Sequence, residues 1–265
     1  GYRGSAPEAC PQCGSLDTAF SGFGTEQVEQ EVGSRFPGAR VARLDADAGR
    51  AAGATEQILA DFREGRTDIL LGTQMVAKGL NFPGLRLVGV IHADTALSLP
   101  DFRAAERTFS LLVQVAGRAG RYHPDGLVIV QTYRPDFPAV QAAVNSDIDG
   151  FYAAELRTRE ALAFPPAMRL VRIVARARRA DLARQDLLEL SGRMREAGVV
   201  GPGRGDLLGP VECGLAIINR QHRFQLLLRA RAIGPVIARL QPVLSAFRAR
   251  AGVYREIDVD PVQLV

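Results

Sequence analysis

Two arginines separated by two small residues stand in the stretch Gln114–Arg121, which reads QVAGRAGR. Guanidinium groups bind phosphate oxygens through paired hydrogen bonds, and the glycines and alanines let a ligand approach the backbone. Because an apolar pattern of helical period precedes the stretch, Arg118 and Arg121 are expected on a short open turn at the end of a helix. One interpretation is a phosphate-sensing motif of a nucleotide-driven motor. The other is a glycine-rich helix terminus with two solvated arginines.

A second loop with groups that suit phosphate follows the apolar run Asp68–Thr73, DILLGT. Backbone amides, a hydroxyl and an ammonium are offered there by Gly72, Thr73, Gln74, Lys78 and Gly79.

A third polar loop follows the apolar run Leu85–Asp94. Its charged residues are Asp94, Asp101, Arg103, Glu106 and Arg107. In parallel α/β folds ligands bind beyond the carboxyl ends of the strands, so the three loops are expected on one edge of a sheet. Taken singly, each loop is also compatible with solvated loop chemistry.

Lys78 is the only lysine among 33 lysine and arginine residues. A Walker A loop needs Gly-Lys-Ser/Thr, whereas Lys78 lies between Ala77 and Gly79. If the chain belongs to a motor ATPase, the loop that cradles the phosphates is therefore expected outside this sequence.

Cys10 and Cys13 form the motif CPQCG, which presents two thiolates to one tetrahedral zinc ion, with Gly14 allowing the turn. A structural zinc site needs four ligands, and neither Cys213 nor the three histidines show ligand spacing. The motif is therefore interpreted as half of a zinc site whose other ligands precede Gly1. A redox-active pair and an unbound pair are the alternatives.

The composition is that of a globular protein, with 47% hydrophobic and 23% charged residues in a chain of 265. The net charge of +4 is compatible with anionic partners. No apolar run approaches the ~18 residues of a membrane helix, and no basic-then-apolar signal segment opens the chain. We therefore expect a cytoplasmic protein with no membrane partner.

Strands and helices alternate from Gly22 to Pro138, which is the pattern of a parallel α/β fold. Thr25 is the candidate N-cap of a first helix. Further helices are expected at about Thr55–Glu64 and Asp101–Ala116, and strands at Val41–Asp47, Asp68–Thr73, Leu85–Asp94 and Gly126–Tyr133. The continuous apolar strands predict a sheet that is covered on both faces.

The pattern changes beyond about Asp147. An amphipathic helix over Phe151–Pro166 precedes strands and helices in alternation, with room for one more strand at Val211–Ile218. This order predicts a small split βαβ sheet with helices on one face. A basic surface, or alternatively a solvated arginine-rich face, is expected from Arg172, Arg176, Arg178, Arg179, Arg220, Arg223, Arg229 and Arg231.

Two long stretches, GTQMVAKGLNFPGLRLVGVIHAD and DFRAAERTFSLLVQVAGRAGR, resemble motifs V and VI of superfamily 2 helicases, and specifically of the primosomal protein N′ (PriA) family of replication-restart DNA helicases. The resemblance covers nearly the whole chain, because it extends to CPQCG, GFGTEQVEQE, RLDAD, QTYRPDFPAV, FPP, LGP and IDVDP.

The resemblance implies an ATP-dependent 3′ to 5′ DNA helicase that binds stalled or abandoned forks and directs primosome assembly. Implied partners are forked DNA, contacted along the backbone of a single strand, primosome proteins and single-stranded DNA-binding protein. Implied cofactors are ATP with Mg²⁺, shared with an absent first lobe, and Zn²⁺.

The resemblance also assigns roles to residues. Motif VI, whose arginines reach the γ-phosphate bound to the other lobe, corresponds to Gln114, Arg118 and Arg121. Motif V, which couples the phosphate state to a grip on the DNA backbone, corresponds to Gly72, Thr73, Gln74, Lys78 and Gly79. The zinc ligands correspond to Cys10 and Cys13.

Three segments are implied by the same family: a partial zinc-binding segment over residues 1–20, a RecA-like second helicase lobe over residues 21–146, and a small α+β domain over residues 147–265. The first lobe, with its Walker A lysine and DEAH-like motif, is expected to precede them. Two functions stay open, a motor lobe of a DNA helicase and a non-catalytic fork-binding scaffold that recruits primosome proteins. The intact QVAGRAGR and GTQMVAKG favour the motor, because a lobe released from ATP chemistry has no need to keep both arginines.

Overall fold

The computed structural model describes residues 24–44, 53–73, 81–119 and 125–264. The chain divides into two compact units, Gly1–Val88 with Gln114–Val128 and Gly89–Val113 with Ile129–Val265. The division falls within helix α4 (Ala104–Ala119), so the two ends of this helix belong to different units.

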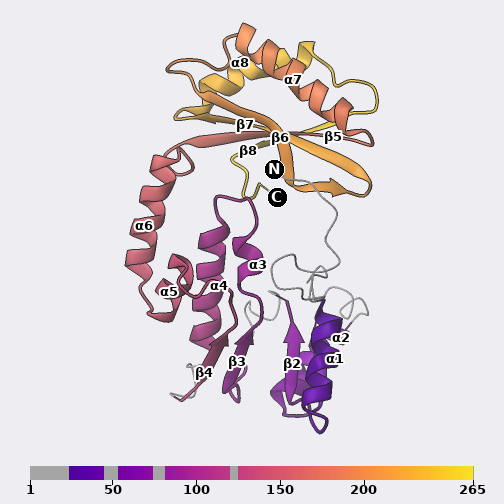
Figure 1. The fold of residues 1–265 in the computed structure, drawn as a ribbon, viewed down its shortest axis with the longest axis vertical. Coiled ribbons are helices and arrows are strands. Elements are labelled where there is room, and N and C mark those ends of the chain that lie inside the picture. Colours follow the sequence, from indigo (N-terminus) through magenta and orange to yellow (C-terminus); the bar gives the residue numbers. More distant parts are fainter. Residues whose placement is uncertain (1–23, 45–52, 74–80, 120–124, 265) are drawn as a thin grey trace, which may run out of the picture. The chain divides into compact units, whose positions relative to one another are not determined.

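Two helices and two strands of the first unit are α1 (Thr25–Arg35), β1 (Val41–Leu44), α2 (Ala54–Arg63) and β2 (Ile69–Gly72) (Figure 1). The strands pair in parallel, from Val41 opposite Ile69 to Leu44 opposite Gly72. This is the α/β alternation that the sequence predicts.

An ion pair joins the residues that precede β1 and β2. Arg40 donates from Nε and Nη2 to the carboxylate of Asp68 at 2.9 and 2.7 Å, and its backbone N–H donates to the same group at 2.8 Å. These hydrogen bonds lower the pKa of Asp68 from the usual 3.8 to about 2. Because each partner lies one residue ahead of its strand, the pair fixes how the two strands align.

The start of α1 differs from the prediction by one residue. Thr25 is the first helical residue and Gly24 is the N-cap, with no side-chain capping hydrogen bond. The amides of Gln27 and Val28 donate to the carbonyl of Gly24, which places the first helical turn one residue earlier than the Thr25 cap predicted.

Strands β3 (Leu87–Val90) and β4 (Leu127–Val130) pair with each other in a second two-stranded sheet. The sequence predicted one sheet covered on both faces, whereas residues along β3 and β4 alternate between exposed and half-buried. Leu87 and Leu127 are each 55% exposed. A short apolar run fits a half-exposed strand as well as a buried one, so periodicity alone could not distinguish them.

The second unit has a small core where α5 (Pro138–Val144) and α6 (Ile148–Ala161) pack against the first half of α4. Its buried residues are Phe109, Leu112, Ala139, Val140, Ala143 and Phe151. The rings of Phe109 and Phe151 stack with their centroids 4.0 Å apart. A short helix, α3 (Asp94–Leu97), follows β3.

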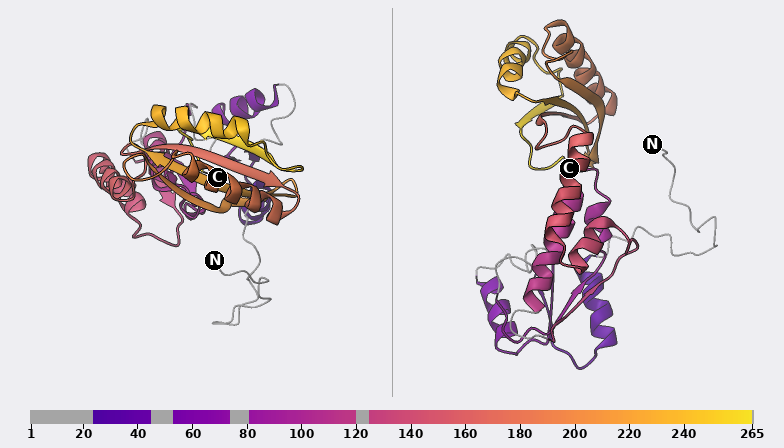
Figure 2. Two further views of the ribbon diagram at one scale, coloured as in Figure 1. Left: turned by 90° about the horizontal axis from the view of Figure 1, so that it is seen from above. Right: turned by 90° about the vertical axis from the view of Figure 1, so that its left-hand side faces the viewer.

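A four-stranded antiparallel sheet forms the rest of the second unit, in the order β6-β7-β5-β8. Its elements are β5 (Arg169–Ala177), α7 (Ala180–Glu196), β6 (Asp206–Ile218), β7 (Gln221–Ala230), α8 (Ile233–Ala246) and β8 (Tyr254–Val259). Figure 1 and Figure 2 show both helices over the same face of the sheet.

Alternate residues of the central strands β5 and β7 face these helices, as period-two burial requires. The core they form includes Val171, Ile173, Ala175, Leu187, Leu190, Met194, Leu226, Leu228 and Val236. The predicted split βαβ sheet with helices on one face is confirmed, and the additional strand is β6. None of the helices in the described ranges is both long and apolar enough to cross a membrane.

Candidate functional site

Gln114 and Arg118 lie one turn apart on α4, so their side chains share one face of the helix. The sequence predicted that the helix ends near Ala116, which is wrong, because α4 continues to Ala119. Val115 and Ala119, 5% and 0% exposed, extend the buried stripe of the helix past its internal glycine. Gln114 is exposed and Arg118 is half-buried, so an amide and a guanidinium group occur together on a regular helix instead of an open turn.

Gly72 is the last residue of β2, and Thr73 follows it; both are exposed. The other residues predicted for motifs V and VI, and both predicted zinc ligands, lie outside the described residues: Gln74, Lys78, Gly79, Arg121, Cys10 and Cys13. Within the ranges that the structure describes, no group of three or more His, Cys, Asp or Glu side chains could hold a metal ion.

Asp94, in the third polar loop, binds the segment that follows β4. Its Oδ1 accepts a hydrogen bond from the hydroxyl of Thr132 at 2.9 Å, and its Oδ2 accepts one from the N–H of Tyr133 at 2.8 Å. Burial raises the pKa of Asp94, but the hydrogen bonds from Tyr133 and Thr132 outweigh it and leave the pKa below its usual value. Both carboxylate oxygens of Asp94 therefore bind other parts of the protein.

Two other carboxylates of that loop are also bound by the protein. Asp101 has a side chain that is 0% exposed and lies 3.2 Å from Nη1 of Arg107. Glu106 lies 2.6 Å from Nη2 of Arg159, whose side chain is 10% exposed. The sequence suggested that these carboxylates face a ligand. In the structure they bind side chains and backbone groups of the protein itself, and so hold the fold together.

Several arginines of the predicted basic surface have partners within the C-terminal sheet or at the start of α7. Arg172 is buried and donates from Nε to Oε1 of Gln225 at 2.7 Å. Ion pairs join Arg176 to Glu256, Arg179 to Asp181 and Arg229 to Asp206. Arg172 is therefore not part of the predicted basic surface, and carboxylates offset the charge of Arg176, Arg179 and Arg229.

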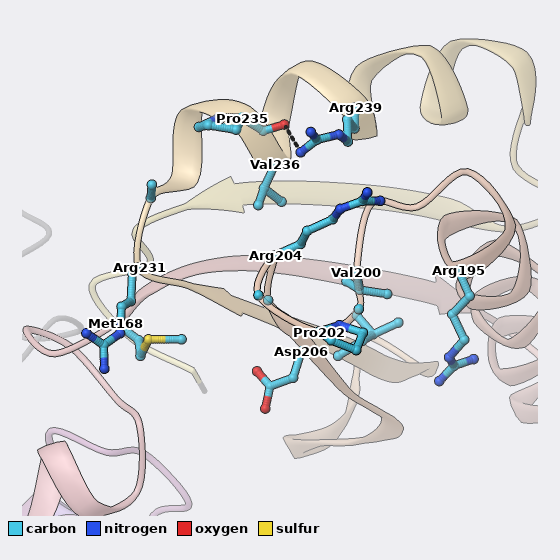
Figure 3. Close-up of a pocket in the computed structure, with 15 residues that line it drawn as sticks. Met168, Arg195, Val200, Pro202, Arg204, Asp206, Arg231, Pro235, Val236 and Arg239 are labelled. Carbon is cyan, nitrogen blue, oxygen red and sulfur yellow. Dashed lines mark hydrogen bonds between the residues drawn. The ribbon is translucent and has the colours of Figure 1, made fainter.

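A pocket of about 990 Å³ lies between the end of α7, the glycine-rich turn that follows it and the start of α8. Its basic residues are Arg195, Arg204, Arg231 and Arg239. Figure 3 shows these side chains at separate points around the pocket, with Val200, Val236 and Met168 among the apolar residues between them.

The pocket carries positive charge that its own residues do not neutralise. Neutral oxygens accept the hydrogen bonds of three of its guanidinium groups: Gly198 O from Arg204 at 3.1 Å, Pro235 O from Arg239 at 3.4 Å, and Ser191 Oγ from Arg195 at 3.2 Å. Asp206, the only carboxylate among the lining residues in the described ranges, already pairs with Arg229. Such a pocket attracts anions.

The motifs singled out in the sequence did not indicate this pocket, whose glycine-rich turn spans residues 201–205, GPGRG. Gly201, Gly203 and Gly205 have positive φ angles of 149°, 73° and 145°. This cluster of glycines, with an arginine inside it, was the available signal for a turn that exposes its backbone and one guanidinium group.

Two family models match the chain in succession. The helicase conserved C-terminal domain matches residues 20–123, and the primosomal protein N C-terminal domain matches residues 160–262. The helicase domain is a RecA-like α/β fold, which agrees with the fold class that the sequence predicts.

Curated relatives share similarity over the whole chain. The replication restart protein PriA of Treponema pallidum is 48% identical over 265 residues, which is 100% of this chain and 40% of the relative. The proteins of the same name from Bacillus subtilis and Haemophilus influenzae are 37% and 35% identical over 100% of this chain, and it spans 33% and 36% of their lengths. With both family models matched in order and these relatives aligned over the whole of this chain, the chain belongs to the PriA family of replication restart proteins.

Proposed function

We propose that the chain supplies the second motor lobe and the C-terminal domain of an ATP-dependent 3′ to 5′ DNA helicase that acts in replication restart. The observation that carries this proposal is the shared face of Gln114 and Arg118 on α4, in the stretch that also holds Arg121. The names of the relatives, which describe replication restart, support the same role.

Arg118 and Arg121 would approach the γ-phosphate of a nucleotide held by another lobe, where guanidinium charge stabilises the transition state of phosphoryl transfer. Gln114, exposed on the same face as Arg118, would orient groups around that phosphate. When bound, ATP with Mg²⁺ supplies the phosphoryl group that is transferred. This chain has no Walker A loop of its own, since its only lysine is Lys78.

Gly72 and Thr73, exposed at the end of β2, would begin a loop that continues through Gln74, Lys78 and Gly79 and grips the DNA backbone. The arginine-lined pocket of the C-terminal domain would add further phosphate contacts. None of the lining residues that the structure describes is aromatic, so the contacts proposed there are to phosphates and not to stacked bases. Contacts of this kind are independent of sequence and weaken steeply with salt.

The proposed organisation has a partial zinc-binding segment over residues 1–20, in which Cys10 and Cys13 share Zn²⁺ with cysteines elsewhere in a longer protein. The helicase lobe spans residues 21–146 and the C-terminal domain residues 147–265. Proposed partners are forked DNA, primosome proteins and single-stranded DNA-binding protein, and such a protein would act in the cytoplasm, at the nucleoid.

An ATP hydrolysis assay tests the proposal that the nucleotide is held by another lobe and that this chain supplies the arginines. The purified 265-residue chain should not hydrolyse ATP, whereas a protein that joins it to an upstream lobe with a Walker A loop should do so when single-stranded DNA is added. Hydrolysis by the chain alone, or none by the joined protein, contradicts the proposal.

A further inference from the structure

The C-terminal tail, residues 260–264, binds the segment that begins α4. Asp101 lies three residues before this helix, and its side chain is 0% exposed. Oδ1 of Asp101 accepts a hydrogen bond from the N–H of Arg103 at 2.9 Å, and Oδ2 accepts one from the N–H of Leu264 at 2.9 Å. One buried carboxylate therefore fixes the start of α4 and the tail together.

Arg107 binds the tail at a second point. Its Nη2 donates to the carbonyl of Val262 at 2.6 Å, while its Nη1 lies 3.2 Å from the Asp101 carboxylate. Leu264 is 4% exposed and Val262 is 69% exposed, so the tail buries one side chain and turns another to solvent. The tail is held through a backbone donor, a backbone acceptor and one apolar anchor.

The same tail also binds the C-terminal sheet, through β5. Nη1 of Arg172, on β5, donates to the carbonyl of Gln263 at 3.3 Å. The N–H of Asp260 donates to the carbonyl of Leu170, also on β5, at 2.8 Å. A continuous set of contacts thus runs from the sheet through the tail to α4.

Two other contacts hold the first half of α4 from the side of α6. Glu106 pairs with Arg159 at 2.6 Å. Before the helix, the ring of Phe102 stacks on Phe164, with centroids 5.3 Å apart and an interplanar angle of 7°. The start of α4 is therefore held by residues that precede β5 in the sequence, Arg159 and Phe164, and by the tail that follows β8.

We propose that Asp101 is a positioning residue, which uses the C-terminal tail to set the direction of α4 and hence the placement of Gln114 and Arg118 at its other end. A helix of 16 residues is about 24 Å long, so a tilt of about 5° at its start moves its far end by about 2 Å. Displacement of a reacting group by about 1 Å can lower a rate by about 10²-fold. The tail thereby acts on Gln114 and Arg118 through α4.

Hydrogen–deuterium exchange in the 265-residue chain tests the restraint on α4 without any assay of activity. Asp101→Asn removes the charge that Arg107 binds, and Leu264→Ala removes the apolar anchor of the tail. Asp260→Asn is the matched control, because it makes the same Asp-to-Asn change within the tail but removes a charge that binds Arg169 on β5 and not a residue of α4; the two side chains of that ion pair are 42% and 51% exposed.

Exchange of the amides of α4 should rise about tenfold or more in both test variants, while β5 and α7 keep the protection of the unaltered protein. Asp260→Asn should leave α4 unchanged. Unchanged exchange of α4 in both test variants overturns the proposal. So does an equal rise in β5 and α7, which would mark a general loss of structure.

The catalytic consequence rests on the proposed function and is measured in a protein joined to an upstream ATP-binding lobe. Asp101→Asn and Leu264→Ala should lower the DNA-stimulated kcat about tenfold or more and leave the KM for ATP unchanged, because ground-state binding belongs to the other lobe. Asp260→Asn should retain full kcat. An unchanged kcat in the test variants refutes positioning, whereas absent hydrolysis in the unaltered protein refutes the proposed function and leaves the exchange experiment to decide on Asp101.

Discussion

Nη2 of Arg255 donates to Oδ1 of Asp186 at 2.8 Å, in an ion pair whose side chains are only 8% and 0% exposed. The same carboxylate accepts a hydrogen bond from the N–H of Arg250 at 2.9 Å. The pair ties α7 to β8 and to the loop before it. One acidic residue of a helix thus anchors the edge strand of the C-terminal sheet.

Asp186→Ala should destabilise the protein by about 3–5 kcal/mol, because it leaves the buried guanidinium group of Arg255 without its charge partner. Asp181→Ala, on the same helix, should destabilise the protein far less, since its pair with Arg179 is exposed. Urea unfolding followed by circular dichroism gives both values. Equal losses in the two variants would show that the buried pair has no special role.

Acid should weaken the link between β1 and β2 through Asp68. Its pKa in the folded protein is lowered to about 2 by the hydrogen bonds from Arg40, below the usual 3.8. A lowered folded pKa means that the stabilising contribution is fully present above about pH 4 and is lost as the pH falls through about 2. Asp68→Asn should flatten the pH dependence of unfolding in that window. A carboxyl titration of Asp68 near 3.8, followed by NMR, would rule out the pairing.

The arginine-lined pocket should contribute phosphate contacts to binding of single-stranded DNA. Arg204→Gln with Arg239→Gln should weaken binding and reduce the slope of log affinity against log salt by about 1.4, at about 0.7 for each lost contact. Fluorescence anisotropy of a labelled oligothymidylate across a salt series measures this slope.

Arg179→Gln with Arg193→Gln is the control for total charge, because these arginines pair with Asp181 and Glu189 and do not line the pocket. The control should keep most of the slope. Equal changes in the two double variants would show that general electrostatics, and not the pocket, binds DNA. Loss of binding to an acidic peptide with intact binding to DNA would assign the pocket to a protein partner.

Periodicity was sufficient to predict the C-terminal sheet. Strand β5 lies within a run rich in β-branched and other apolar residues, and only Arg178 and Arg179 separate it from the long helix α7, so each local pattern has one interpretation. For the shorter strands β3 and β4, the sequence predicted their place in the α/β alternation but not how exposed their residues are. Four-residue runs carry too little pattern to show how many faces are covered.

Sequence predicted the residue types of the candidate site better than its geometry. The motif identified Gln114 and Arg118. It did not show that α4 continues past Ala116, because the burial of Ala119 is visible only in the folded protein. The role of Asp101 could not be predicted, because its partner Leu264 lies 163 residues away along the chain. Contacts at such separation are products of the folded topology and leave no local signal.

The arginines of the stretch QVAGRAGR are assigned to the γ-phosphate of ATP. The most direct test of this assignment is DNA-stimulated ATP hydrolysis by a protein that joins this chain to an upstream Walker A lobe, with Arg121→Ala or Arg118→Ala. Arg35→Ala is the control, because Arg35 lies exposed on α1 in a pair with Glu31. We expect kcat to fall by about 10³-fold or more for Arg121→Ala, with salt-sensitive DNA binding retained and the control unaffected. Turnover equal to that of the unaltered protein would exclude a role of these arginines in ATP hydrolysis.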